Sequence, residues 1–289
     1  MGQDEGMTTS SVPLAITGAT GRLGGRIAHR LAAAGVAQRL LVRDPARAPQ
    51  LPGSTTVRAS FGDSDAVRRA LEGVNTVLMV SAAESADRVD QHRCFIDAAA
   101  AAGVEQVVYI SFYGAAPAAA FTLARDHFAT EQHLRASGLA FTFLRDNLYT
   151  DFLPMLAASD GVIRGPAGDG RVAAVTQDDI ADATTAVLLD PAAHRGATYS
   201  LTGPESLTMA EVAAILTEGL GTPITYHDET LAEAYASRAS YGAPDWQVDA
   251  WVSTYTAIAA GELAGVTHDV ERLGGHPATS VRDFLRAGR

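Results

Sequence analysis

The feature that most constrains the fold is a glycine-rich turn at residues 17–24, which read Thr-Gly-Ala-Thr-Gly-Arg-Leu-Gly and follow an apolar run. In such a turn Gly18 permits a sharp bend off a strand, Gly21 removes a Cβ where a pyrophosphate approaches, and Gly24 lets a helix pack closely on the sheet. The amide groups that open this helix face the phosphates, and the helix dipole favours negative charge there. Because a strand precedes the turn and a helix follows it, a dinucleotide site is favoured over a merely structural turn. The binding residues predicted from the turn are Gly18, Thr20, Gly21, Arg22 and Leu23.

Short β-type runs alternate with longer helical stretches over the first half of the chain. Strands are expected at residues 12–17, 40–43, 55–59, 74–80, 104–110 and 139–144, and helices at 23–34, 64–71, 86–102 and 121–137. The strands are apolar on both faces, as in a parallel sheet covered by helices on both sides. This βαβ alternation predicts an α/β fold with a doubly wound parallel sheet of the Rossmann type over residues 12–150.

The rhythm of strands and helices breaks after the sixth strand, where glycine-rich loops begin. A helix and then a strand at 198–201 follow, so residues 171–202 are expected to return to the sheet. Thr208 and Glu211 have the spacing of a capping box at the start of another helix. The remaining chain favours short helices. We expect residues 151–289 to form a smaller, mostly helical region on the substrate side.

Composition excludes several classes of partner. The net charge is −11, and the 22 Lys and Arg residues are all arginines, which are scattered along the chain. Nucleic acids and anionic membranes require clustered positive charge. No apolar run approaches the roughly 18 residues that span a bilayer. Residues 1–11 are polar and lack the apolar core of a signal peptide, which predicts a disordered leader and a cytoplasmic protein. The oligomeric state stays open, a homodimer included.

The residues after the second strand indicate the type of dinucleotide. Arg43 stands about 20 residues past the glycine turn, where a guanidinium can bind a ribose 2′-phosphate with both of its arms. Arg22, inside the turn, can assist. Asp44 would favour NAD if its side chain turned inward, but the arginines favour NADP(H). Ser81 and Ala82, after the fourth strand, are small enough for the cofactor ribose to lie against the sheet edge.

The chain resembles the NmrA-like, atypical short-chain dehydrogenase family, which uses this form of the glycine turn. Within it the sequence is similar to the branch of bacterial NAD(P)H:quinone oxidoreductases and triphenylmethane dye reductase, most distinctively at residues 143–152 (Phe-Leu-Arg-Asp-Asn-Leu-Tyr-Thr-Asp-Phe) and 168–170 (Gly-Asp-Gly). The resemblance implies NADPH-dependent two-electron reduction of quinones or dyes. Other members of the family are non-catalytic redox sensors that bind NADP and a regulatory protein, and this alternative stays open.

The chain contains no lysine, and this absence favours some classes of hydride acceptor over others. Ketone-reducing and epimerising members of the superfamily protonate the substrate oxygen with a Tyr-x-x-x-Lys pair, so both activities are disfavoured. Hydride transfer to a quinone leaves only a phenolate-like oxygen, whose pKa is about 10, and a cationic dye is simply neutralised. For such acceptors, positioning against the nicotinamide carries most of the catalysis. A quinone-like or other aromatic small molecule is therefore the expected substrate.

Candidate side chains lie after the fifth and sixth strands, since open α/β sheets bind ligands at the carboxyl ends of their strands. Phe112 and Tyr113 follow the fifth strand, and Asn147 and Tyr149 follow the sixth. We expect substrate contacts from Phe112 and Tyr149 and a catalytic role for Tyr113. Asn147 either holds the nicotinamide carboxamide or caps the following helix.

Two further candidates lie on helices. His127 is the expected proton donor because the pKa of histidine is near neutrality; the alternative is a surface histidine without a role. Trp246, Trp251 and Tyr255 are interpreted as one face of a helix, which either lines an aromatic pocket or packs the helix on the domain. Trp246 is the substrate contact expected from this group.

Overall fold

The computed structural model describes residues 14–157 and 159–288. The leader expected at residues 1–11, and the first two residues of the strand expected at 12–17, lie outside the described residues. Within these ranges no helix is long and apolar enough to cross a membrane.

The centre of the fold is a sheet of seven parallel strands in the order β3-β2-β1-β4-β5-β6-β9. The strands are β1 (Leu14–Thr17), β2 (Gln38–Val42), β3 (Ser54–Arg58), β4 (Thr76–Val80), β5 (Gln106–Phe112), β6 (Ala140–Asp146) and β9 (Thr198–Leu201). The order reverses between β1 and β4, and the crevice at such a reversal is where open sheets bind ligands. The doubly wound parallel sheet is confirmed.

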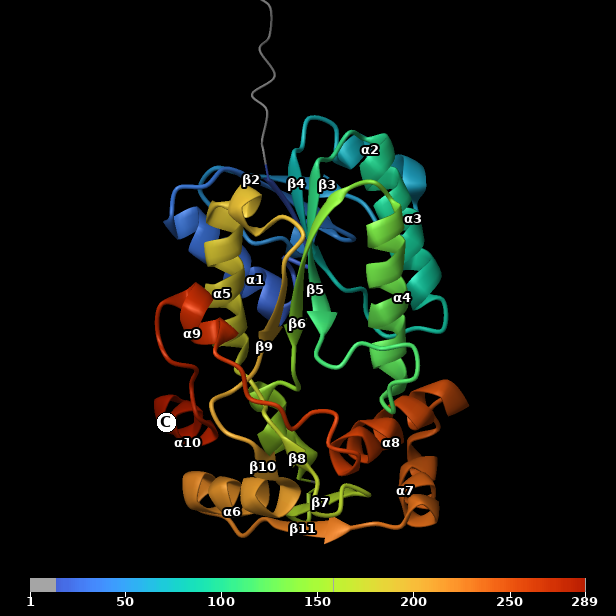
Figure 1. Cartoon of the computed structure of the whole chain (residues 1–289), viewed down its shortest axis with the longest axis vertical. Helices are drawn as coiled ribbons and strands as arrows, with labels where there is room; N and C mark the ends of the chain where they lie inside the picture. Colours follow the sequence, from blue (N-terminus) through green and yellow to red (C-terminus); the bar gives the residue numbers. More distant parts are fainter. Residues whose placement is uncertain (1–13, 158, 289) are drawn as a thin grey trace, which may run out of the picture.

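Helices cover both faces of this sheet (Figure 1). On one face α1 (Arg22–Ala33) packs on α5 (Gln177–Leu189), which also contacts α9 (Asp269–Gly274). The other face carries α2 (Ser64–Ala70), α3 (Arg88–Ala101) and α4 (Thr122–Ala136). Because strand side chains alternate, Ile16 faces the α1 side and its neighbour Ala15 the α3 side, each in a separate hydrophobic core.

Of residues 171–202, which are expected to return to the sheet, β9 pairs within it, whereas Arg171–Val172 pair with β10 (Leu207–Thr208) outside it. Helix α5 follows the first part of the second region and packs against α1, and β9 then pairs in parallel with β6 from Phe143–Thr198 to Asp146–Leu201. The chain therefore leaves the sheet after β6 and rejoins it at β9, so the two regions are joined more than once.

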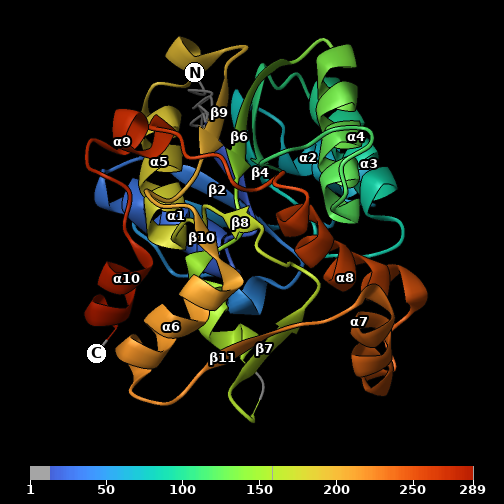
Figure 2. The same ribbon diagram turned by 60° about the horizontal axis from the view of Figure 1, so that its bottom comes forward.

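The second region lies beyond the carboxyl edge of the sheet and comes forward in Figure 2. Its elements are η2 (Thr150–Leu156), β7 (Val162–Gly165), β8 (Arg171–Val172), β10 (Leu207–Thr208), α6 (Met209–Leu220), β11 (Thr225–Asp228), α7 (Leu231–Arg238), α8 (Asp245–Ala259) and α10 (Val281–Ala287). Strands β7 and β11 pair in parallel and β8 and β10 antiparallel. The region is thus less purely helical than its sequence indicates, because its short strands carry little periodicity.

One difference in strand length bears on the site. Strand β5 runs on to Phe112 and β6 to Asp146, and these two residues pair in register. Phe112 and Asp146 are therefore parts of the rigid sheet edge, and not of the loops that follow it.

Candidate dinucleotide and acceptor site

The glycine turn forms a cradle that only glycine permits. Gly18 has φ +69°, and a Cβ on Gly24 would lie 2.3 Å from the carbonyl oxygen of Gly18. Gly21 precedes α1 in an extended conformation, and among the residues that the structure describes no side chain caps the start of this helix. Open amides at the start of a twelve-residue helix suit a pyrophosphate, so the residues present fit a dinucleotide.

The two charged residues after β2 have separate tasks. Asp44 Oδ1 accepts the N–H of Ala46 at 3.1 Å and caps the short helix η1 (Pro45–Arg47). Arg43 is exposed, and its guanidinium has no hydrogen bond or ion pair within the described residues. The Asp44 carboxylate, which would favour NAD if it turned inward, is engaged in this cap. The free guanidinium of Arg43 suits a 2′-phosphate.

Arg22 connects the turn with the second region. Its guanidinium carbon lies 5.8 Å from the centroid of the Phe152 ring in η2. Thr20 beside it is exposed, whereas Leu23 is buried in the core beneath the turn. Thr20 and Arg22 therefore border the cradle, and Leu23 contributes its backbone only.

The loop between β4 and α3 is held from inside the protein. The N–H of Ala82 donates to Nε2 of the buried His92 at 2.9 Å, and Nδ1 of His92 lies 2.8 Å from the Thr130 hydroxyl. Burial, with help from Arg88, lowers the pKa of His92 to about 3, so the ring stays neutral. The amide of Ala82 is thus engaged by His92, and half-buried Ser81 is the residue left to border the ribose. Sequence reasoning missed this anchor, because a histidine inside a helix carries no signal of its contacts.

His127 differs from its expected state. It is 6% exposed, Nε2 accepts from the Arg88 guanidinium at 3.1 Å, and Nδ1 lies 2.9 Å from the hydroxyl of Tyr109. Burial first, and then the charge of Arg88, hold the pKa of His127 well below its usual value. The expected role of His127 as proton donor depends on a near-neutral pKa, which the buried ring does not have. The alternative, a histidine on the helix surface, does not apply either, because the side chain is buried.

Arg88 itself is a buried cation at the start of α3. Its charge is compensated only in part, since Asp126 lies 3.8 Å away. Its Nε has no hydrogen-bond partner among the described residues. A donor is therefore open beside the carboxyl edge of the sheet.

The aromatic pair at the end of β5 serves packing. Phe112 is buried against Phe121, with ring centroids 4.9 Å apart, and its ring centroid lies 6.0 Å from that of His127. The hydroxyl of Tyr113 lies against Gly265, where an added Cβ would approach it to 2.0 Å. Neither Phe112, the expected substrate contact, nor Tyr113, the expected catalytic residue, is among the residues that line the large cavity of the second region.

Asn147 is fully buried and has a third function. Its Nδ2 donates to the carbonyl of Leu263 at 3.0 Å, and its Oδ1 accepts the N–H of Leu148 at 2.8 Å. Both ends of the amide are therefore engaged within the protein. The residue therefore ties the end of β6 to the C-terminal segment, and the following helix η2 has Tyr149, not Asn147, as its N-cap.

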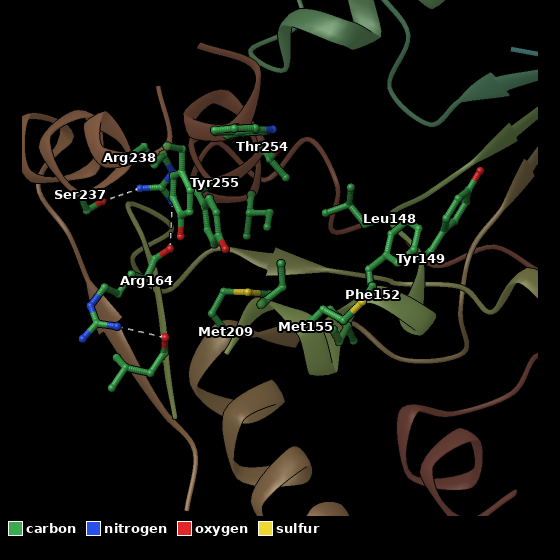
Figure 3. A pocket seen from close by; sticks show the side chains of 16 residues that line it. Leu148, Tyr149, Phe152, Met155, Arg164, Met209, Ser237, Arg238, Thr254 and Tyr255 are labelled. Carbon is green, nitrogen blue, oxygen red and sulfur yellow. Dashed lines mark hydrogen bonds between the residues drawn. The ribbon is translucent and has the colours of Figure 1, made fainter. Parts of the chain in front are cut away.

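The acceptor cavity has a volume of about 710 Å³ and lies between η2, β7, α6, α7 and α8 (Figure 3). Most of its wall is apolar. Its aromatic and sulfur-containing lining residues are Tyr149, Phe152, Met155, Met209, Tyr241, Trp251 and Tyr255. Tyr149 thus lies where the sequence predicts a substrate contact.

Trp246 does not line this cavity. Five residues of helix advance about 500°, so Trp246 is displaced by about 140° from Trp251 around the axis. Trp251 and Tyr255, four residues apart, do share the cavity-facing side of α8. The aromatic face is therefore real, but it is composed of the later two residues.

Arg238 lines the cavity, but its charge is paired within the protein. Its guanidinium donates to Glu229 at 2.9 Å and to the carbonyl of Arg164 at 3.0 Å, and its carbon lies 5.4 Å from the centroid of the Tyr255 ring. Because these internal partners neutralise the cation, the cavity favours an uncharged or delocalised ring system.

A buried acid stands at the sheet end of the cavity. Asp146 is 3% exposed, and its Oδ2 accepts the hydroxyl of Tyr149 at 2.7 Å. Burial raises the pKa of Asp146 to about 8, against the smaller opposing effects of the Tyr149 hydrogen bond and the Arg88 charge. The carboxyl is therefore largely protonated at neutral pH. Sequence reasoning did not single it out, since nothing local distinguishes a buried aspartate from an exposed one.

These features define an α/β dinucleotide-binding protein with an apolar acceptor cavity at the carboxyl edge of its sheet. The chain belongs to the NAD(P)H-binding family, whose profile matches residues 18–191. It is 36% identical over 279 residues to quinone oxidoreductase 2 of Escherichia coli, covering 94% of this chain and 97% of that protein.

Solved structures agree with the fold. Triphenylmethane reductase of Citrobacter sp., complexed with NADP(H), superposes with a TM-score of 0.85 at 28% identity, covering 96% of this chain and all of that one. NmrA, a negative transcriptional regulator in complex with NADP, has a TM-score of 0.74 at 19% identity, covering 94% of each chain. The last likeness concerns the fold alone, and the family resemblance seen in the sequence is confirmed.

Replacing Asn147 separates a structural amide from a cofactor contact. We expect Asn147→Ala to lower the free energy of unfolding by about 1–3 kcal/mol, because it removes a fully buried amide that makes two hydrogen bonds. The dissociation constant of NADPH should change less than about twofold. Urea unfolding and fluorescence titration measure the two quantities. A large loss of NADPH affinity in a protein of unchanged stability would contradict this assignment.

Proposed function

We propose that this chain is an NADPH-dependent reductase that delivers hydride to a quinone or to another conjugated, dye-like acceptor. The observation that carries the proposal is the aromatic cavity of about 710 Å³ that begins at Tyr149, just after β6. Ligands of open α/β sheets bind at this edge, so a nicotinamide bound beyond the glycine turn meets the sheet end of the cavity. The activities named for the relatives support the same reaction.

NADPH, when bound, supplies the hydride. The chain holds the pyrophosphate at the amides that follow Gly21, and Arg43 and Arg22 are the cations available for phosphate. The aromatic walls align a flat acceptor by stacking, and the acceptor displaces water from them when it binds. The contribution of the protein is therefore mainly orientation and desolvation.

The cavity distinguishes this proposal from the alternatives. A redox sensor that only binds NADP has no need of an apolar cavity for a second aromatic molecule. An epimerase needs a positioned acid–base pair, and the lysine of the Tyr-x-x-x-Lys pair is missing from this chain. We include in the proposal that the partner is a small aromatic molecule and not a nucleic acid, since the net charge is −11.

One assay tests the reaction. NADPH absorbance is followed with a panel of quinones and cationic triphenylmethane dyes, and we expect oxidation that depends on the acceptor. The control is the same mixture without acceptor. NADPH that binds tightly but is oxidised by no member of the panel would favour the sensor and overturn the reductase.

The preference for NADPH depends on Arg43. Arg43→Ala should raise the dissociation constant of NADPH by about tenfold or more, because a charge-assisted hydrogen bond to phosphate contributes about 1.5–3 kcal/mol. The value for NADH should stay within about twofold. Arg69→Ala, at an exposed arginine of α2, is the matched control. Equal losses for the two cofactors would exclude a contact between Arg43 and the 2′-phosphate.

The two tryptophans of α8 provide an internal comparison. Trp251→Ala should raise KM for a quinone by about fivefold to tenfold, because a stacking face of roughly 1 kcal/mol or more is lost from the cavity wall. Trp246→Ala should leave KM within about twofold. Both variants are assayed at saturating NADPH, and a larger effect from Trp246 would mean that the acceptor lies elsewhere.

A further inference from the structure

Reduction of a neutral quinone by hydride leaves a negative charge on an oxygen, and that oxygen must take up a proton. His127 is neutral and both of its ring nitrogens are engaged. We propose that Asp146 is the proton reservoir of the reductase, and that it passes its proton through the hydroxyl of Tyr149 to the anionic oxygen of the reduced acceptor. This inference rests on the proposed function and adds the source of the proton.

The geometry supports a relay of these two side chains. Asp146 ends β6 at the carboxyl edge of the sheet, and its Oδ2 lies 2.7 Å from the Tyr149 hydroxyl. Tyr149 in turn lines the cavity. Figure 3 shows its ring at one end of the cavity, with the hydroxyl pointing away from the apolar body and toward the strands. A nicotinamide at the sheet edge reduces an acceptor at this end, where the hydroxyl is.

The surroundings keep the carboxyl uncharged. Within the described residues Arg88 is the one cation whose charge reaches Asp146, and its guanidinium donates to His127 instead. Glu131 and Asp151, the nearby acids, are paired with Arg145 at 2.6 Å and with Arg26 at 3.2 Å. Asp146 therefore has no ion-pair partner there and retains its proton at neutral pH.

Protonation of Asp146 also sets the direction of the hydrogen bond. When the carboxyl is ionised, Tyr149 must donate to it, and burial and this charge together hold the pKa of Tyr149 well above its usual value. When the carboxyl is neutral it can donate to the Tyr149 oxygen. The phenolic proton is then no longer bound to the carboxyl and can be donated to an acceptor oxygen that lies beside it at the sheet edge.

The step balances as follows. NADPH is oxidised by loss of hydride, the quinone is reduced, and the electron pair arrives on a quinone oxygen. That oxygen takes the Tyr149 proton, the phenol oxygen takes the Asp146 proton, and the carboxylate recovers a proton from water. Transfer from an acid of pKa about 8 to a phenolate-like oxygen of pKa about 10 is downhill.

Two acceptors of different charge test the relay. A cationic triphenylmethane dye becomes neutral on accepting hydride and needs no proton, so it reports on every part of the reaction except the relay. Asp146→Asn should lower kcat for a neutral quinone by on the order of 10²-fold, the effect of losing a positioned acid. kcat for the dye should change less than about twofold, which also shows that the variant is folded. Tyr149→Phe should give the same pattern.

The pH profile supplies a second readout. Because the protonated carboxyl is the active form, wild-type kcat for the quinone should be constant below pH 7 and fall as the pH rises through about 8. Asp146→Asn should remove this fall, and the dye should not show it. Asp179→Asn, at a buried carboxylate bound to Thr279 at 2.8 and 2.9 Å, and Tyr199→Phe are controls expected to keep the wild-type profile.

Three results would overturn the relay. The first is an Asp146→Asn variant with wild-type quinone kcat and pH profile. The second is equal loss with quinone and dye, which indicates a structural role only. The third is a wild-type protein that oxidises NADPH with neither acceptor; this outcome rejects the proposed function itself, and it is recognised before any variant is made.

Discussion

The close approach of α1 to the end of β1 is the constraint on which the rest of the structure depends. An added Cβ on Gly24 would lie 2.3 Å from the Gly18 carbonyl oxygen, so this contact tolerates no side chain. It brings the open amides of α1 to the crevice between β1 and β4, where the strand order reverses. The β4–α3 loop and the aromatic cavity are both placed relative to this edge.

Burial of charge is the second organising principle of the site. His92, His127 and Asp146 lie buried within the protein near the carboxyl edge of the sheet, and the pKa of each departs from its usual value. The two histidines lose their protons because desolvation penalises the charged form, and the aspartate keeps its proton for the same reason. His127, which the sequence suggests as the proton donor, therefore has no proton to spare at neutral pH. Asp146, which would be ionised in water, keeps its proton.

The parts of the fold that could be predicted from the sequence are those that depend on contiguous residues. Apolar strands, glycines that end helices and the capping box at Thr208 and Glu211 all report local backbone geometry, and these elements are observed. The second region was predicted less well, since pairs such as β8 with β10 join segments far apart in the sequence. Trp246 does not share the cavity-facing side of α8 with Trp251 for a simpler reason, which is that five residues do not complete a whole number of helical turns.

The sequence by itself determined the dinucleotide-binding fold and, through the absence of lysine and the family resemblance, the class of acceptor. A glycine turn specifies its own backbone path, and the absence of a residue type needs no structure to establish. Only the tertiary structure decided which side chains are acids. The pKa of Asp146 and the occupied nitrogens of His127 depend on neighbours from several elements, and burial among distant residues cannot be read from a local pattern.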